Sequence, residues 1–119
     1  MKKILVIEDE KPMARALQLK LTKEGFEVEN AYDGTEAMSL IEKNKYDLIV
    51  TDLVLAKIDG FEIIKRAREE GIKTPIIVTS NLSQTEDEKK VLELGANKYF
   101  IKSNTPIVEI IENIKAFLK

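Results

Sequence analysis

Four short runs of continuously apolar residues constrain the fold of this 119-residue chain more than any other feature of its sequence. The runs are Ile4 to Ile7, Leu48 to Val50, Ile76 to Val78 and Tyr99 to Ile101. Because polar residues do not alternate within them, each run is typical of a strand in a parallel sheet that helices cover on both faces. A fifth segment, Phe26 to Glu29, does alternate and predicts a half-exposed strand at a sheet edge.

Stretches with helical periodicity separate these strands. The first contains Met13, Leu17 and Leu21, with Pro12 near its start and Gly25 after its end. Further helices are marked by Ala37 and Ile41, by Gly60 to Ala67, by Val91 and Leu94 in a shorter helix, and by Ile107 to Leu118. Strand and helix are therefore expected to alternate five times.

This alternation favours a doubly wound α/β fold, a five-stranded parallel sheet of the (βα)5 type with right-handed crossovers. An edge position for the second strand fits the order 2-1-3-4-5, the flavodoxin-like arrangement. Ligands of such sheets bind beyond the carboxyl ends of the strands, where the chain reverses between the first and third strands. The length suffices for one hydrophobic core, so we expect a single domain over residues 1–119.

The composition excludes several classes of function. The chain has no cysteine and no histidine, which removes disulfides, zinc sites and serine–histidine catalysis. Its 19 basic and 21 acidic residues form no basic stripe interleaved with aromatic residues, so direct nucleic-acid binding is not expected. The first apolar run ends at Glu8 after four residues, too few for a signal peptide or a membrane span. We therefore expect a cytoplasmic protein without a membrane partner.

Polar residues that follow the central strands are the candidates for chemistry. They are Glu8 and Asp9 after the first strand, Asp52 after the third, Thr79 and Ser80 after the fourth, and Lys102 after the fifth. Clustered carboxylates repel one another unless a cation lies among them, and Mg²⁺ suits oxygen ligands and phosphate. Lys102 and a hydroxyl from the fourth strand would contact an oxyanion on the sides that the metal ion leaves open. The pattern predicts a phosphoryl site with Asp52 as the nucleophile.

These residues resemble the receiver domains of response regulators in two-component signal transduction, over essentially the whole chain. The family has an acidic pair after the first strand, here Glu8-Asp9, and then the pattern Asp-Leu-x-Leu-Pro-x-Met-Asp-Gly. Residues 52–60 read DLVLAKIDG and depart from that pattern at Ala56 and Ile58. Asp59 is interpreted as the cap of the following helix rather than as part of the site.

The family also has a proline-led strand that ends in a hydroxyl residue, a lysine after the next strand, and an aromatic residue before that lysine. Counting five residues from Pro75 selects Ser80 rather than Thr79. Twenty-two residues later stands Lys102, with Tyr99 three places before it. The combination of these elements at family spacing makes the resemblance specific.

The resemblance implies a phosphorylation-activated switch that catalyses only its own phosphorylation and slow autodephosphorylation. It assigns Mg²⁺ to Glu8, Asp9, Asp52 and the backbone carbonyl of Val54, catalysis to Asp52, Lys102 and Ser80, and the switch to Ser80 and Tyr99. The phosphoryl donor would be a sensor histidine kinase or a histidine phosphotransfer protein. The surface formed by the fourth and fifth strands and helices would change on phosphorylation and so control an effector domain or protein. The resemblance also allows a dimer that forms on phosphorylation.

The chain departs from the family near the site. Lys102 precedes Ser103 instead of the usual proline, and a cis bond there would cost about 2.5 to 4 kcal/mol, so we predict a trans bond. Asn81 is bulkier than the usual small residue and should narrow the mouth of the site. Val54 and Leu82, which by resemblance border the path of a hydrolytic water, are apolar and predict slow loss of the phosphoryl group.

Three alternative functions share parts of this pattern. A degenerate receiver would bind partners without being phosphorylated, although its carboxylates and lysine are intact here. A flavin-binding domain of the same architecture would need a Ser/Thr/Gly-rich loop after the first strand, where this chain has an acidic pair. A phosphatase with an aspartate nucleophile after the first strand would need more chain for its remaining motifs.

Overall fold

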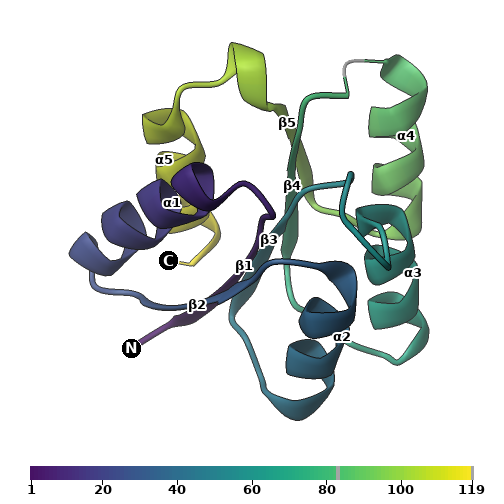
Figure 1. The fold of residues 1–119 in the computed structure, drawn as a ribbon, viewed down its shortest axis with the longest axis horizontal. Coiled ribbons are helices and arrows are strands. Elements are labelled where there is room, and N and C mark those ends of the chain that lie inside the picture. Colours follow the sequence, from purple (N-terminus) through teal and green to yellow (C-terminus); the bar gives the residue numbers. More distant parts are fainter. Residues whose placement is uncertain (83, 119) are drawn as a thin grey trace.

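The computed structural model describes residues 1–82 and 84–118, and in this part of the chain five strands alternate with five α-helices (Figure 1). The strands are β1 (Lys3–Ile7), β2 (Glu27–Ala31), β3 (Leu48–Thr51), β4 (Ile76–Ser80) and β5 (Lys98–Ile101). The helices are α1 (Lys11–Lys23), α2 (Gly34–Lys43), α3 (Gly60–Glu69), α4 (Thr85–Leu94) and α5 (Ile107–Phe117), with a short 3-10 helix, η1 (Lys102–Asn104), before α5.

The strands form one parallel sheet in the order β2-β1-β3-β4-β5, which confirms the predicted doubly wound fold with β2 at an edge. At the carboxyl end of β1, Ile7 lies opposite Ala31 of β2 on one side and opposite Thr51 of β3 on the other. The chain therefore changes direction between β1 and β3. The residues that follow these two strands flank the switch point at which such sheets bind ligands.

Helices cover both faces of the sheet (Figure 1). Ile4 and Val6 of β1 belong to the core that includes side chains of α1 and α5, whereas Leu5 and Ile7 belong to the core that includes side chains of α2, α3 and α4. Each central strand thus sends alternate side chains into two cores, which explains why its sequence is continuously apolar. Among the described helices, none has the length and apolar character needed to cross a membrane.

Two elements differ from their expected form. β2 begins at Glu27 rather than Phe26, because the N–H of Phe26 still donates to the carbonyl of Leu21 at the end of α1. α4 is as long as α2 and α3, with 10 residues in each, and not shorter as predicted. Its apolar pattern is weak because Val91 is its one buried residue, so most of the helix carries no periodic signal.

The bond that follows Lys102 is trans, as predicted, because no peptide bond in the described residues is cis. The chain leaves β5 through η1, which begins at Lys102 itself. The lysine that the sequence assigns to the site therefore lies at a sharp turn and not in an extended strand end.

Two glycines are required by close packing at the segment that follows β3. A Cβ atom on Gly34 would lie 1.7 Å from the carbonyl oxygen of Ile58, and one on Gly60 would lie 2.2 Å from the carbonyl oxygen of Asp52. Such separations are far inside van der Waals contact. The first residues of α2 and α3 are thus packed directly against the backbone that carries and follows Asp52.

Aspartate side chains cap these same two helices. Asp33 accepts a hydrogen bond from the N–H of Glu36 at 2.8 Å, and Asp59 accepts one from the N–H of Glu62 at 2.9 Å. Both bonds satisfy a backbone donor that the first helical turn leaves unpaired. The capping role expected for Asp59 is confirmed.

Candidate functional site

A cavity of about 410 Å³ opens at the carboxyl ends of the central strands. Its lining residues come from the last residue of β4 and from the segments that follow β1, β3 and β4; they are Asp9, Glu10, Asp52, Val54, Ser80, Asn81 and Leu82. The position coincides with the switch point of the sheet. The candidate site therefore lies where the fold favours ligand binding.

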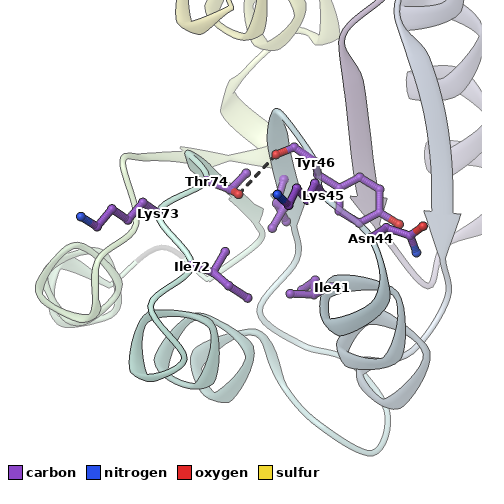
Figure 2. A pocket seen from close by; sticks show the side chains of 8 residues that line it. Ile41, Asn44, Lys45, Tyr46, Ile72, Lys73 and Thr74 are labelled. Atoms are coloured by element: carbon purple, nitrogen blue, oxygen red, sulfur yellow. Dashed lines mark hydrogen bonds between the residues drawn. The ribbon is translucent and has the colours of Figure 1, made fainter.

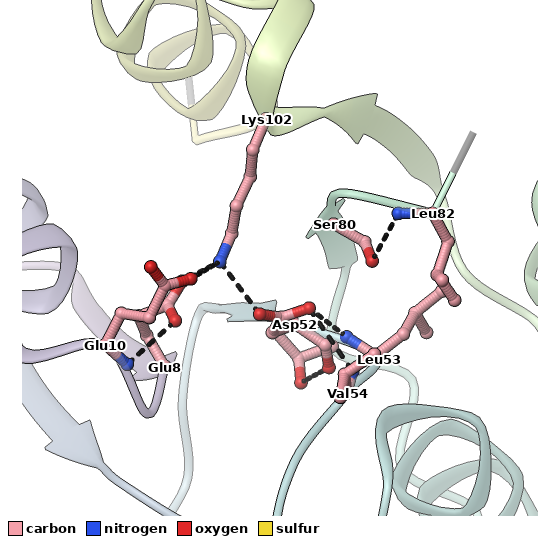
Figure 3. Close-up of polar contacts among 9 residues, drawn as sticks. Glu8, Glu10, Asp52, Leu53, Val54, Ser80, Leu82 and Lys102 are labelled. Carbon is pink, nitrogen blue, oxygen red and sulfur yellow. Dashed lines mark hydrogen bonds and ion pairs between the residues drawn. The ribbon is translucent and has the colours of Figure 1, made fainter.

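Asp52 lies at the floor of this cavity, directly after β3 (Figure 3). Its N–H donates to the carbonyl of Ile7, which fixes its backbone beside β1. Its side chain is nearly buried, and Oδ1 accepts hydrogen bonds from the N–H groups of Leu53 at 2.6 Å and Val54 at 3.3 Å. The carboxylate is thus held by backbone donors on one side while Oδ2 contacts the ammonium of Lys102 on the other.

Lys102 joins three carboxylates through one ammonium group (Figure 3). Its Nζ lies 2.5 Å from Oε1 of Glu8, 2.8 Å from Oδ2 of Asp52 and 3.4 Å from Oε1 of Glu10. Burial alone would lower the pKa of Lys102, but its bonds to Asp52 and Glu8 outweigh burial and raise the pKa. The lysine therefore stays charged at neutral pH.

Glu8 is almost completely buried, with 1% of its surface exposed. Burial raises its pKa, and the contacts with Lys102 and with the N–H of Glu10 offset part of that rise. Oε2 accepts the Glu10 N–H, whereas Oε1 has the ion pair with Lys102 but no well-formed hydrogen bond within the described residues. This buried oxygen is thus held by its charge contact with the lysine rather than by a directional hydrogen bond.

The acidic residues at this edge have the composition of a magnesium site. Carboxylate oxygens of Glu8, Asp9, Glu10 and Asp52 lie within 4.8 Å of one another. Hard oxygen ligands from one or two carboxylates, with room for water, are what Mg²⁺ prefers. The residues present therefore fit that ion. The sequence interpretation did not assign Glu10, because an acidic residue in a loop before a helix gives no pattern that separates a site from a solvated surface.

Ser80 lines the cavity, whereas Thr79 does not. Ser80 is fully buried at the end of β4, and its Oγ accepts the N–H of Leu82 at 3.2 Å. The hydroxyl hydrogen is not used by that bond and can be donated to an oxyanion in the cavity. Asn81, next in the chain, is exposed at the rim, as expected.

Tyr99 is half-buried on β5 and lies outside the cavity lining. Its hydroxyl donates to the carbonyl of Leu82, so it contacts the segment between β4 and α4. Burial raises the pKa of Tyr99, and the negative charge of Asp87 adds to that effect. Leu82 is thus bonded through its N–H to Ser80 and through its carbonyl to Tyr99.

A second cavity, of about 260 Å³, is lined by residues of α2, of β3 and of the segments between α2 and β3 and between α3 and β4 (Figure 2). Ile41, Ile49 and Ile72 give it apolar walls, and the hydroxyl of Thr74 donates to the carbonyl of Tyr46 at its rim. It contains no carboxylate among its lining residues, and the side chain of Lys73 points away from it. It therefore lacks the acidic cluster found around Asp52.

The model of the response regulator receiver domain family matches residues 4–115. The chain belongs to this family. A receiver domain is a signalling module rather than a true enzyme, and this one is the receiver domain of a two-component response regulator. Its acidic pocket of Glu8, Asp9 and Asp52 is consistent with a phosphorylation site.

Curated relatives of this receiver domain are longer than the chain. It is 42% identical over 100 residues to the transcriptional regulatory protein DltR of Streptococcus agalactiae, a match that covers 84% of this chain and 45% of DltR. It is 39% identical over 119 residues to the response regulator ArlR of Staphylococcus aureus, which covers 100% of this chain and 53% of ArlR. The chain therefore spans about half the length of the curated relatives it matches.

Solved structures share the fold over nearly the whole chain. The receiver domain of the Francisella response regulator 1452 superposes with a TM-score of 0.93 at 34% identity, covering 98% of this chain and 96% of that one. TrrA of Thermotoga maritima, in a complex with Mg²⁺-BeF, superposes with a TM-score of 0.86 at 29% identity, covering 98% of this chain and 99% of that one.

Proposed function

We propose that this receiver domain is a phosphorylation-dependent switch in which Asp52 accepts a phosphoryl group from a phosphohistidine of a sensor histidine kinase or histidine phosphotransfer protein. The observation that carries the proposal is the position of the Asp52 carboxylate, which lines the cavity as part of the acidic cluster and contacts Nζ of Lys102. An oxygen of Asp52 attacks phosphorus while the bond from phosphorus to the histidine nitrogen breaks. The electron pair stays on the imidazole, which then takes up a proton from solvent.

Mg²⁺ is the cofactor that we propose for this reaction. Glu8, Asp9, Asp52 and the backbone carbonyl of Val54 would hold it, and Mg²⁺ supplies positive charge that stabilises the transferring phosphoryl oxygens. Glu8 contributes a buried carboxylate whose Oε1 is at present paired with the Lys102 ammonium, and Asp9 contributes an exposed carboxylate. The fit of this donor set supports the proposal, as does the presence of Mg²⁺-BeF in the complex of TrrA.

Lys102 and Ser80 then stabilise the product. The Lys102 ammonium, which now contacts Oδ2 of Asp52, would contact an oxygen of the new phosphoryl group, and the Ser80 hydroxyl would donate to another. Ser80 is bonded to the backbone of Leu82, and Leu82 is bonded to Tyr99. A shift of Ser80 toward the phosphoryl group would therefore move the backbone of Leu82. The side chain of Tyr99 would then either follow Leu82 or lose its hydrogen bond to the Leu82 carbonyl.

The output is proposed to pass through the surface formed by β4, α4, β5 and α5 to an effector domain or protein. This surface adjoins the Ser80–Leu82–Tyr99 contacts, which connect it to the cavity. The lengths of DltR and ArlR, and the name of DltR as a transcriptional regulatory protein, support an effector that controls transcription. We place the switch in the cytoplasm and assign no direct nucleic-acid contact to this chain.

Incubation with acetyl phosphate and Mg²⁺, followed by intact-mass analysis, tests the proposal. Wild type should gain one phosphoryl group only when Mg²⁺ is present, and Asp52→Asn should gain none. Asp59→Asn is the matched control, because Asp59 is a helix cap outside the cavity, and it should be labelled as wild type is. Labelling of Asp52→Asn would reassign the acceptor, and unlabelled wild type would favour a phosphorylation-independent interaction module.

A further inference from the structure

Glu10 occupies a helix-capping position but does not cap the helix. It precedes α1, and its side chain makes no hydrogen bond to the first turn. Its carboxylate instead lines the cavity over Asp52, with Oε1 3.4 Å from Nζ of Lys102. With 61% of the side chain exposed, Glu10 lies at the mouth of the site, whereas Glu8 and Asp52 lie at its floor.

The charges around the cavity do not balance. Four carboxylates cluster there, and within residues 1–82 and 84–118 Lys102 is the one cation at ion-pair distance from any of them. A bound divalent cation would still leave a net negative charge of one. The contact between Glu10 and Lys102 is the longest of the three that the lysine makes, so Glu8 and Asp52 hold Lys102 more closely than Glu10 does.

We propose that Glu10 selects among phosphodonors by repelling small anionic ones from the mouth of the Asp52 cavity. A small phosphorylated anion has no contacts other than those at the cavity, where the exposed Glu10 carboxylate repels it. A phosphohistidine on a partner protein is carried past it by the protein–protein contacts around the site. This inference rests on the proposed function of Asp52 and adds the class of donor that the site disfavours.

Glu10→Gln keeps the size of the side chain and removes its charge. With acetyl phosphate, which is a dianion at neutral pH, the phosphorylation rate should rise about 5- to 10-fold at low ionic strength, and the gain should shrink near 1 M salt, where the Debye length is about 3 Å. Phosphoramidate carries less charge and should show a smaller gain. Glu42→Gln, an exposed residue of α2 with the same charge change, is the control and should match wild type.

Two binding measurements separate this role from others. The affinity for inorganic phosphate in saturating Mg²⁺, followed by the amide resonances of Asn81 and Leu82, should tighten about fivefold in Glu10→Gln. The dissociation constant of Mg²⁺ itself, measured by titration of each variant, should change by less than the anion affinity does.

Two outcomes would overturn the inference, and a third bears on the proposed function alone. A rate and an anion affinity that match Glu42→Gln would show that Glu10 is a solvated surface residue. A slower rate with weakened Mg²⁺ binding would make Glu10 a metal ligand. If wild type is not phosphorylated at all, the proposed function fails, whereas the anion titration still decides whether Glu10 repels anions.

Discussion

Nζ of Lys102, at the end of β5, lies 2.8 Å from Oδ2 of Asp52, at the end of β3. The two strands are not neighbours, because β4 lies between them. The ion pair therefore spans the edge of the sheet above Ser80, and both of its side chains are nearly buried. It fixes the side chain that we propose as phosphoryl acceptor and at the same time neutralises part of the acidic cluster.

Removal of the Lys102 charge should destabilise the metal-free domain. Lys102→Met leaves the nearly buried carboxylates of Glu8 and Asp52 without their cation, which should lower the free energy of unfolding by about 3 kcal/mol. Added Mg²⁺ should restore more stability to this variant than it gives wild type. Urea unfolding with and without Mg²⁺ measures both effects. Lys89→Met, on the exposed face of α4, is the control, and equal stability of the two variants would contradict the prediction.

Ser80→Ala should uncouple phosphorylation from output. Asp52 keeps its own contacts, so labelling by acetyl phosphate should continue, but the phosphoryl group loses a hydroxyl donor in the active arrangement. A charge-assisted hydrogen bond is worth roughly 2 kcal/mol, which corresponds to a population shift of roughly 30-fold. The affinity of the phosphorylated variant for its output partner, compared with phosphorylated wild type, measures the shift. Equal affinities would remove Ser80 from the switch.

The phosphorylated state should decay slowly, over many minutes. Val54 and Leu82 both line the cavity, and their apolar side chains offer no hydrogen bond to an attacking water. Val54→Asn/Leu82→Glu supplies polar groups on both sides of the phosphoryl group and should shorten its lifetime at fixed Mg²⁺. The decay of the intact-mass adduct gives the rate for each form. A double variant that decays no faster would show that these positions do not control the water.

Lys57 has a positive φ of 72°, in the left-handed region that favours glycine. Its Nζ lies 3.5 Å from Oδ2 of Asp33, but an ion pair at the surface is screened by solvent and contributes little to stability. Lys57→Gly and Lys57→Ala both lose the pair, and only glycine relieves the backbone strain. The free energy of unfolding of Lys57→Gly should therefore be about 1 kcal/mol higher than that of Lys57→Ala. Equal stabilities in chemical denaturation would mean that the loop relaxes around alanine.

The pKa of Asp33 should lie below the usual value for aspartate. The N–H of Glu36 donates to its carboxylate and lowers the pKa, and the charge of Lys57 lowers it further. A lowered pKa in the folded state means that the Asp33 charge stabilises the domain above the unfolded pKa of about 3.9, and that this contribution is lost as the pH falls through the folded pKa. Asp33→Asn keeps a capping oxygen, so its stability deficit relative to wild type should disappear on acidification.

The Lys57→Ala background provides the control for Asp33. There the pKa of Asp33, read from its carboxyl carbon resonance, should rise part of the way toward the usual value, because the hydrogen bond from Glu36 remains. If the pKa of Asp33 is the same in Lys57→Ala as in wild type, the whole lowering of that pKa comes from the hydrogen bond of the helix cap.

The sequence was sufficient to predict the order of the strands and the meeting of Glu8, Asp52 and Lys102. Both follow from general rules, because continuously apolar runs require a parallel sheet and the carboxyl ends of parallel strands share an edge. The position of Glu10 could not be predicted in this way. An exposed carboxylate leaves no periodic signal, and its approach to Lys102 depends on how η1 turns the chain after β5.

Other details depend on contacts that no local pattern encodes. The positive φ of Lys57 was not anticipated, because lysine has no preference for that conformation and the tight packing of Gly34 on Ile58 imposes the path of the loop. The bonds from Leu82 to Ser80 and Tyr99 likewise join residues on two strands and a loop. Sequence spacing selected Ser80 and Tyr99 for the switch but gave no information about the backbone that connects them.

The approach of Gly60 to the Asp52 carbonyl limits how this protein can evolve. With only 2.2 Å available to a Cβ atom, every other amino acid at position 60 would displace the backbone of the proposed acceptor. Substitutions at Gly60 should therefore be removed by selection for signalling, even where the helix that begins there would tolerate or gain from alanine. A position that touches neither phosphate nor metal is thus under the same constraint as the carboxylate eight residues before it.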